Sequence, residues 1–351
     1  MRITTNQDER EQRLTQWVAQ EFGLESSQLQ LQSVASDAGF RRYYRFSNPS
    51  HWLAVDAPPQ TENTHQFVAL ARYLGKHQVN APKILVADED AGLLLVEDFG
   101  DELLYKHLNL HSATTQYQQV FDALLKIQAC PDQPALIPRY DRDLLRRELQ
   151  LFSDWFVESL LDHPLSLEEK SLLNELFTQV EERALKQPQT FVHRDFHSRN
   201  LLVCKDSSLG IIDFQGALWG PCTYDLVSLL RDCYLRWPAE KVTEWALHYR
   251  QLAVTAGLLA PRISEAHYLE WFDWMGFQRH IKVLGIFSRL NLRDQKKHYL
   301  KDLPLVIRYT LEIAERYPTL QPFAEWFTST LLPKAQRESW YSDYRKAGEA
   351  Q

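Results

Sequence analysis

The residues best suited to do chemistry lie in FVHRDFHSRNLLV at 191–203 and in LGIIDFQ at 209–215. A short apolar run leads into a polar loop with Asp195, and Asn200 then opens a predicted hairpin whose second strand ends at Asp213. Asn200 and Asp213 offer hard oxygen ligands of the kind that Mg²⁺ takes from proteins. Asp195 could orient a hydroxyl group and accept its proton. The pattern therefore predicts phosphoryl transfer from a magnesium-bound nucleoside triphosphate.

Asp and Asn are also common in turns, so a chance match has to be weighed. His193, Asp195, Asn200 and Asp213 at this fixed spacing would arise by chance in roughly two chains per thousand of this length. The apolar segments that frame both motifs lower that frequency further, and the functional interpretation is favoured.

The elements that must position these residues fall into two regions. From about residue 29 to 99, five short β-like runs are separated by turn residues, with one predicted helix at 61–75. The runs are LQLQSVAS, RRYYRFS, WLAVDA, KILVADE and GLLLVEDF. An amphipathic helix precedes them, and Gly23 ends it.

Beyond Asp101 the apolar residues recur at three- and four-residue spacing, which predicts helices near 114–129, 141–163 and 166–187. Asp141 and Ser166 are expected N-caps, with Ser166 and Glu169 in capping-box register. The hairpin of 200–214 interrupts the helices, which return from about Tyr224. We predict an α+β fold of two lobes: residues 1–98 as a small β-rich nucleotide-binding lobe, and residues 99–351 as a large helical lobe with the catalytic loop and the acceptor site.

Composition limits the partners. The chain has 351 residues with 39 Lys and Arg against 46 Asp and Glu, a net charge of −7, whereas a nucleic-acid binder needs a basic excess. The four cysteines match no zinc or redox spacing. The N-terminus has no apolar signal core, and no run approaches the ~18 apolar residues of a membrane span. We expect a cytoplasmic protein with a small-molecule substrate and neither a nucleic-acid nor a membrane partner, and a monomer by default.

HRDFHSRN resembles the H-x-D-x-x-x-x-N catalytic loop of the aminoglycoside and choline phosphotransferases, and IIDFQ resembles their D-F metal motif. Tyr224-Asp225-Leu226 is similar to the Y-D-L of the same family. The resemblance implies a protein-kinase-like bilobal fold that uses ATP and Mg²⁺. It assigns catalysis to Asp195, metal binding to Asn200 and Asp213, and structural support of the loop to Asp225. His193 lies on the apolar side of the loop, so a hydrogen-bonded supporting role is favoured over a catalytic one.

Four further segments, SDAGFRRYYRF, LAVDAPP, LLLVEDFGD and DWMGFQRHIKVLGIFSRL, resemble the anomeric sugar kinases of bacterial cell-wall recycling. That resemblance implies phosphorylation of N-acetylmuramate, N-acetylglucosamine or both at the C1 hydroxyl. Alternatives are a kinase of an aminoglycoside, choline or homoserine, and a nucleotide-binding pseudokinase. A protein kinase is the weakest alternative, because no A-P-E segment follows Asp213.

The nucleotide side departs from the kinase pattern. Asp56 stands where such a lobe places a strand lysine, and the glycine-rich loop is reduced to Gly39. Arg41 and Arg42 follow that loop, and one of them is expected to supply the missing positive charge, because neighbours on a strand point to opposite faces. The competing interpretation makes both arginines solvated edge charges.

In the expected hinge, 96–100, Glu97 and Phe99 are predicted to present backbone groups to adenine. On the acceptor side, Arg199 lies inside the catalytic loop. Arg279 and Lys282 lie on a predicted helix at 271–290, away from its apolar stripe. They form either a solvated basic face or part of an acceptor pocket, where they would suit the carboxylate of N-acetylmuramate.

Overall fold

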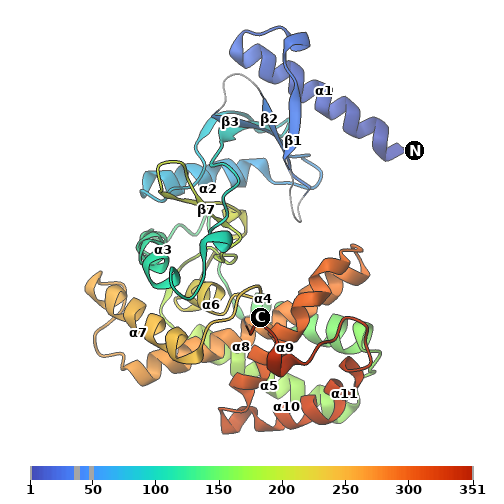
Figure 1. The fold of residues 1–351 in the computed structure, drawn as a ribbon, viewed down its shortest axis with the longest axis vertical. Coiled ribbons are helices and arrows are strands. Elements are labelled where there is room, and N and C mark those ends of the chain that lie inside the picture. Colours follow the sequence, from blue (N-terminus) through green and yellow to red (C-terminus); the bar gives the residue numbers. More distant parts are fainter. Residues whose placement is uncertain (1, 35–39, 47–50, 350–351) are drawn as a thin grey trace. The chain divides into compact units, whose positions relative to one another are not determined.

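The predicted β-rich region forms one antiparallel sheet in the computed structural model, which describes residues 2–34, 40–46 and 51–349 (Figure 1). Its strands are β1 (Leu31–Val34), β2 (Arg42–Phe46), β3 (Trp52–Asp56), β4 (Ile84–Asp88) and β5 (Leu93–Glu97). They are ordered β1-β2-β3-β5-β4, and every neighbouring pair is antiparallel. All five predicted strands are confirmed. The expectation for the loop around Gly39 lies outside the described residues.

Helix α1 (Arg2–Phe22) covers one face of this sheet with the predicted apolar stripe. Leu14 and Val18 pack with Tyr44, Ala54 and Leu95, which alternate with residues of the opposite face. Helix α2 (Thr64–Lys76) contacts β4. It begins a few residues later than predicted because Asn63 is its N-cap and accepts the Gln66 N–H at 3.0 Å.

The hairpin of β7 (Leu201–Val203) and β8 (Leu209–Ile211) belongs to the same compact unit as the sheet. The Val203 N–H donates to the Glu102 carbonyl at 2.7 Å, and the Ile211 N–H donates to the Asn80 carbonyl at 2.9 Å. This unit therefore comprises Met1–Leu108 and Arg199–Gly216, whereas we predicted a boundary after residue 98 with the hairpin in the helical lobe. The difference arises because three-residue strands satisfy their outer backbone groups on the nearest available chain.

The second unit comprises Asn109–Ser198 and Ala217–Gln351 and is mainly helical. Its main helices are α3 (Ala113–Gln128), α4 (Arg142–Leu151), the π-helical η3 (Phe152–Leu160), α5 (Leu167–Leu185), α6 (Tyr224–Leu230), α7 (Ala239–Thr255), α8 (Glu265–Leu292), α9 (Leu303–Ala314), α10 (Gln321–Trp326), the π-helical η7 (Phe327–Leu331) and α11 (Leu332–Ala335). A short antiparallel pair, β6 (Gln189–Val192) and β9 (Leu218–Pro221), joins them. The two-unit α+β architecture is the predicted fold class.

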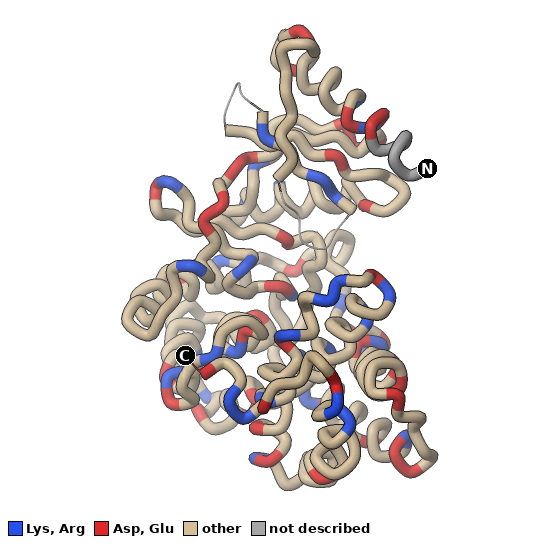
Figure 2. The backbone as a smooth tube through the Cα atoms, turned by 45° about the vertical axis from the view of Figure 1, so that its right-hand side comes forward, with Lys and Arg blue, Asp and Glu red and all other residues tan. Residues whose placement is uncertain are grey.

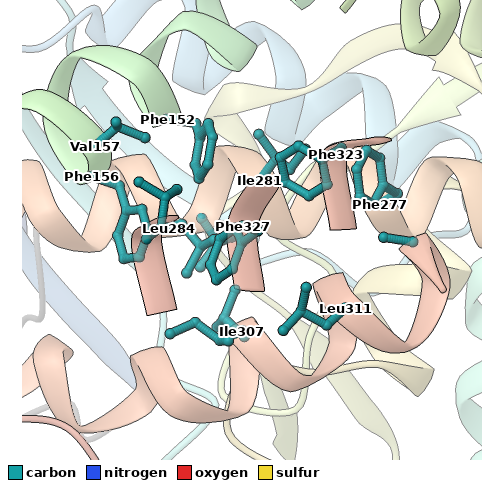
Figure 3. Close-up of a cluster of buried hydrophobic side chains, with 14 of the residues drawn as sticks. Phe152, Phe156, Val157, Phe277, Ile281, Leu284, Ile307, Leu311, Phe323 and Phe327 are labelled. Atoms are coloured by element: carbon teal, nitrogen blue, oxygen red, sulfur yellow. The ribbon is translucent and has the colours of Figure 1, made fainter. Parts of the chain in front are cut away.

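The core of the helical unit forms around α8, whose predicted apolar stripe is buried. Phe277, Ile281 and Leu284 contact aromatic and aliphatic side chains from η3, α9, α10 and η7 (Figure 3). Gly285 allows α8 to approach the end of α4 closely, because a Cβ at this position would lie under 3.0 Å from backbone atoms of Leu151. The long helix α8 is therefore held on several sides, which makes it a rigid platform for polar residues on its remaining face.

Both predicted caps are confirmed. The Asp141 side chain accepts the Leu144 N–H at 2.8 Å, and Ser166 and Glu169 form a reciprocal capping box. Acidic and basic residues are interspersed along both units (Figure 2). All four cysteines are free thiols. Among the helices of the described residues, none combines the length and apolar character of a membrane span.

Candidate active site

The loop that carries Asp195 follows β6 in the helical unit and is anchored at both ends by buried carboxylates. Asp225, at the start of α6, accepts the backbone N–H groups of His193 and Arg194 at 2.6 and 2.9 Å. Asp232 accepts the Ser198 N–H at 3.1 Å and its hydroxyl at 2.5 Å. Two carboxylates that bind backbone N–H groups therefore fix the conformation of the loop from residue 193 to residue 198.

The supporting residues have the environments expected of a scaffold. His193 is fully buried and packs edge-on against the Phe196 ring, with 5.9 Å between the ring centres. Burial raises the pKa of Asp225 to about 7, although the two N–H groups that it accepts act to lower it. These contacts are consistent with the predicted supporting roles of His193 and Asp225.

Positive charges surround Asp195. Burial acts to raise the pKa of this carboxyl. The nearby positive charges lower it by a larger amount, so the pKa lies below the ordinary value; these charges are Lys282, His197, Arg194 and Arg279. Asp195 is therefore ionised at neutral pH. A carboxylate is the form that can accept a proton from a hydroxyl group.

Asn200 and Asp213 lie together in the N-terminal unit, at adjacent ends of β7 and β8. The Asn200 Nδ2 donates to Asp213 Oδ2 at 3.3 Å, and the Ile212 N–H donates to the Asn200 carbonyl at 3.1 Å. Asp213 has a φ of 65°, a left-handed conformation that Asp tolerates better than most residues. The Gln215 side chain also donates to Asp213. One carboxylate beside one amide is a donor set that fits Mg²⁺, which takes one or two protein oxygens together with phosphate oxygens and water.

Arg41, directly before β2, and Arg42, its first residue, point to opposite faces, as predicted. Arg42 pairs with Asp56 at 2.8 Å on the face covered by α1, where Arg10 also binds Asp56 through Nε at 2.7 Å. Arg41 pairs with Glu62 at 2.9 Å, and its guanidinium lies 4.2 Å from the centre of the Phe67 ring. Asp56 thus anchors α1 rather than standing in a phosphate site.

Arg41 shares its side of the sheet with the metal-ligand candidates. Burial raises the pKa of Tyr43, and the charges of Arg41 and Asp213 act on the same phenol in opposite directions. Tyr43 therefore lies near both groups. The geometry therefore leaves Arg41, paired with Glu62 just before α2, as the candidate for the charge that replaces the strand lysine.

In the hinge, the Glu97 N–H donates to the Lys83 carbonyl at 2.9 Å, and the Phe99 ring lies against Gly210 of β8. Arg45 binds both Asp98 and Asp101. These contacts fix the hinge to the hairpin and to β2. The nucleotide-binding roles of Glu97 and Phe99 stay predictions.

The three residues predicted for the acceptor side do not belong to one compact unit. Arg199 belongs to the N-terminal unit, and its guanidinium lies 5.0 Å from the centre of the Tyr105 ring. Arg279 and Lys282 are each only 5% exposed, so they do not form a solvated face. Lys282 donates to the Tyr224 hydroxyl at 2.9 Å, and Arg279 donates to the Cys233 Sγ at 3.1 Å.

Sequence reasoning missed Glu148 on α4, which pairs with Lys282 at 3.0 Å and also accepts the Arg194 guanidinium. Glu148 is 3% exposed. It stands among Leu145, Leu149 and Phe152 in the apolar stripe of the predicted helix, and a charge at such a position was the available signal.

An anchored aspartate loop, an Asn–Asp pair at a hairpin and a β-rich unit with a helical one are the parts of a kinase-like phosphotransferase. The chain belongs to the phosphotransferase enzyme family, whose model matches residues 30–262, more than half of its length. It is an enzyme of the phosphoryl-transfer class.

The chain is similar to two curated proteins named N-acetylmuramate/N-acetylglucosamine kinase. The protein from Neisseria meningitidis serogroup B is 36% identical over 295 residues, which cover 82% of this chain and 87% of that protein. The protein from Pseudomonas putida is 38% identical over 296 residues, which cover 84% of this chain and 86% of that protein. Among solved structures, the ADP-bound aminoglycoside phosphotransferase APH(2'')-Ib superposes with a TM-score of 0.58 at 12% identity, over 86% of this chain and 98% of that one. This last similarity supports the fold.

Proposed function

We propose that this protein transfers the γ-phosphoryl group of ATP to the anomeric C1 hydroxyl of N-acetylmuramate and N-acetylglucosamine, in the recycling of peptidoglycan. The observation that carries the proposal is the 36–38% identity, over more than four fifths of the chain, to kinases named for these two sugars. A cytoplasmic location and a monomeric state stay predictions.

In the proposed mechanism, Asp195 accepts a hydrogen bond from the attacking sugar hydroxyl and takes its proton as the bond to phosphorus forms. The ionised state of Asp195 and the anchored loop around it support this role. Asn200 and Asp213 would hold Mg²⁺, which when bound neutralises charge on the phosphate oxygens. Arg41, held by Glu62, is the proposed cationic contact of the triphosphate.

The preference between the two sugars is expected to depend on charge. N-acetylmuramate carries a carboxylate that N-acetylglucosamine lacks, and the Arg279 guanidinium donates to the Cys233 thiol sulfur, which is a weak acceptor. We propose Arg279 as the basic group that favours the acidic sugar, and contacts of Lys282 or Arg199 with the acceptor stay predictions. Arg279→Gln should lower kcat/KM for N-acetylmuramate more than for N-acetylglucosamine. Equal losses for both sugars would remove the carboxylate argument.

The central experiment incubates the protein with Mg-ATP and each of several acceptors, and it identifies the phosphorylated carbon by ³¹P NMR. N-acetylmuramate and N-acetylglucosamine should yield sugar 1-phosphates. The 1-O-methyl glycoside of N-acetylglucosamine is the matched control, because it keeps every group except the anomeric hydroxyl, and it should not react. Phosphorylation of the glycoside would refute the C1 assignment. Turnover of aminoglycoside, choline or homoserine instead of the amino sugars would replace the acceptor class, and no turnover of any acceptor would favour a pseudokinase.

Two variants test the residue roles. Asp195→Asn should lower kcat by about 10²- to 10⁴-fold, the usual contribution of a positioned base, with little change in the KM for ATP. Asp213→Ala should lose magnesium-dependent turnover. Activity of Asp213→Ala near the wild-type level would contradict the metal assignment.

A further inference from the structure

A buried ionic cluster in the helical unit surrounds Glu148. Its carboxylate accepts the Arg194 guanidinium, the Lys282 ammonium at 3.0 Å, the Gln278 amide at 3.3 Å and the Tyr140 hydroxyl. Burial acts to raise the pKa of Glu148, but the charges of Lys282 and Arg194 lower it by a larger amount. The net pKa is below the ordinary value, so the group is ionised. Four donors from three parts of the chain therefore converge on one carboxylate.

Arg194 directly precedes the proposed base and has an unusual backbone. Its φ of 80° lies in the left-handed region, which an L-residue other than Asn or Asp adopts at a cost. Arg194 is held at two points: Asp225 accepts its backbone N–H, and Glu148 accepts its guanidinium. The side-chain bond thus lies where it can stabilise a strained conformation next to Asp195.

The contacts close into a ring. Glu148 binds Lys282, Lys282 donates to the Tyr224 hydroxyl at 2.9 Å, and Tyr224 is the chain neighbour of Asp225. The Asp225 side chain accepts the Arg194 N–H at 2.9 Å, and the Arg194 guanidinium donates to Glu148, which closes the ring. These polar contacts thereby join helices α4, α6 and α8 to the catalytic loop. Hydrogen bonds in a buried network strengthen one another, so the removal of one member weakens the rest.

We propose that Glu148 is a positioning residue for catalysis: by binding Arg194 and Lys282 together, it holds the loop in the conformation that aims Asp195 at the acceptor hydroxyl. Glu148 acts through Arg194 and touches no substrate. The inference rests on the proposed function for the role of Asp195 and for the identity of the acceptor.

Glu181 on α5 provides a matched control. It too is a buried glutamate bonded by two arginines, Arg142 at 3.0 Å and Arg146, both on α4. Glu148→Gln and Glu181→Gln thus remove the same charge from the same kind of ion-pair cluster, and no hydrogen bond or ion pair recorded for Glu181 in the described chain involves the catalytic loop.

The test measures two quantities for both variants. Glu148→Gln should lower kcat by roughly 10²-fold, the cost of a misplaced reacting group, with the KM for ATP and for N-acetylmuramate within about threefold of the wild type. Hydrogen exchange measured by mass spectrometry should show faster exchange at the His193 and Arg194 amides in Glu148→Gln, while Glu181→Gln leaves both the exchange and kcat unchanged. The exchange needs no substrate, so it tests the positioning role even if the amino sugars prove not to be acceptors.

A second pair of variants keeps the proposal falsifiable if Glu148→Gln folds poorly. Arg194→Gly accepts a φ of 80° without strain but lacks the guanidinium, so it should lower kcat on its own. In that background Glu148→Gln should have a smaller effect than in the wild type, because the partner through which it acts is absent. Additive losses, or equal effects of Glu148→Gln and Glu181→Gln on exchange and kcat, would overturn the proposal.

Discussion

Replacement of Asp225 by Asn should remove a pH dependence from the stability of the protein. Asp225 is completely buried, and burial raises its pKa from the ordinary 3.8 to about 7 in the folded protein. In the unfolded chain the same carboxyl ionises near its ordinary value. Between these two pH values the folded state therefore holds a proton that the unfolded state has lost.

The sign and size of the effect follow from proton linkage. Because the unfolded state binds fewer protons over this range, the free energy of unfolding falls as the pH rises, by about 1.4 kcal/mol per pH unit. The contribution is fully present below pH 3.8 and is lost by the time the pH passes the folded pKa of about 7. The whole interval of about 3 units corresponds to about 4 kcal/mol, and Asp225→Asn lacks it.

The assay is urea unfolding of the wild type and Asp225→Asn at several pH values between about 4.5 and 7.5. The stability difference, wild type minus variant, should fall steadily over this range. Asp273→Asn is the control. Burial acts to raise the pKa of Asp273, but Arg231 and Arg316 lower it below the ordinary value, so both the folded and the unfolded states are ionised above about pH 5. The stability difference between the wild type and Asp273→Asn should therefore be flat above about pH 5. A flat difference for Asp225→Asn as well would refute the reasoning.

Four further substitutions test packing, capping and the nucleotide site. Gly285→Ala should destabilise the protein by about 1–3 kcal/mol in thermal unfolding, because the added Cβ would overlap backbone atoms. Gly75→Ala is the control on α2: open space surrounds this position, so the variant should stabilise the protein by up to about 1 kcal/mol. The opposite order of the two effects would contradict the packing of α8. Ser166→Ala should cost about 1 kcal/mol through loss of the capping box, and an unchanged denaturation midpoint would count against that cap. Gly210→Ala should displace the Phe99 ring and raise the KM for ATP more than it lowers kcat, whereas an unchanged KM would argue against Phe99 in the nucleotide site.

Local sequence patterns were sufficient to predict much of the fold and part of the candidate site. The five strands, the helix after β3, the caps at Asp141 and Ser166 and the hairpin between Asn200 and Asp213 depend on residues close in sequence, such as turn formers and alternating side chains. The motif around Asp195 was visible for the same reason, because its polar residues lie within one loop and the strand that follows.

Other features depended on contacts between distant residues. The sequence left open which of Arg41 and Arg42 contacts the triphosphate. In the structure Arg42 pairs with Asp56 on the face covered by α1, which leaves Arg41 as the proposed contact. Helical spacing placed Arg279 and Lys282 off the apolar stripe of α8, but only packing determined that they are buried near Asp195.

The sequence by itself determined the class of chemistry, because a catalytic carboxylate, an amide and a metal-binding carboxylate are encoded at fixed local spacing in residues 193–213. The tertiary structure decided what supports that chemistry. Glu148, Arg194 and Lys282 are separated by 46 and 88 positions along the chain, and their pairing exists only after α4 and α8 pack together. A buried charge is stable only with its partners present, so such a cluster is a product of the folded state. The apolar stripe of α4 marks Glu148 as unusual but does not indicate its partners.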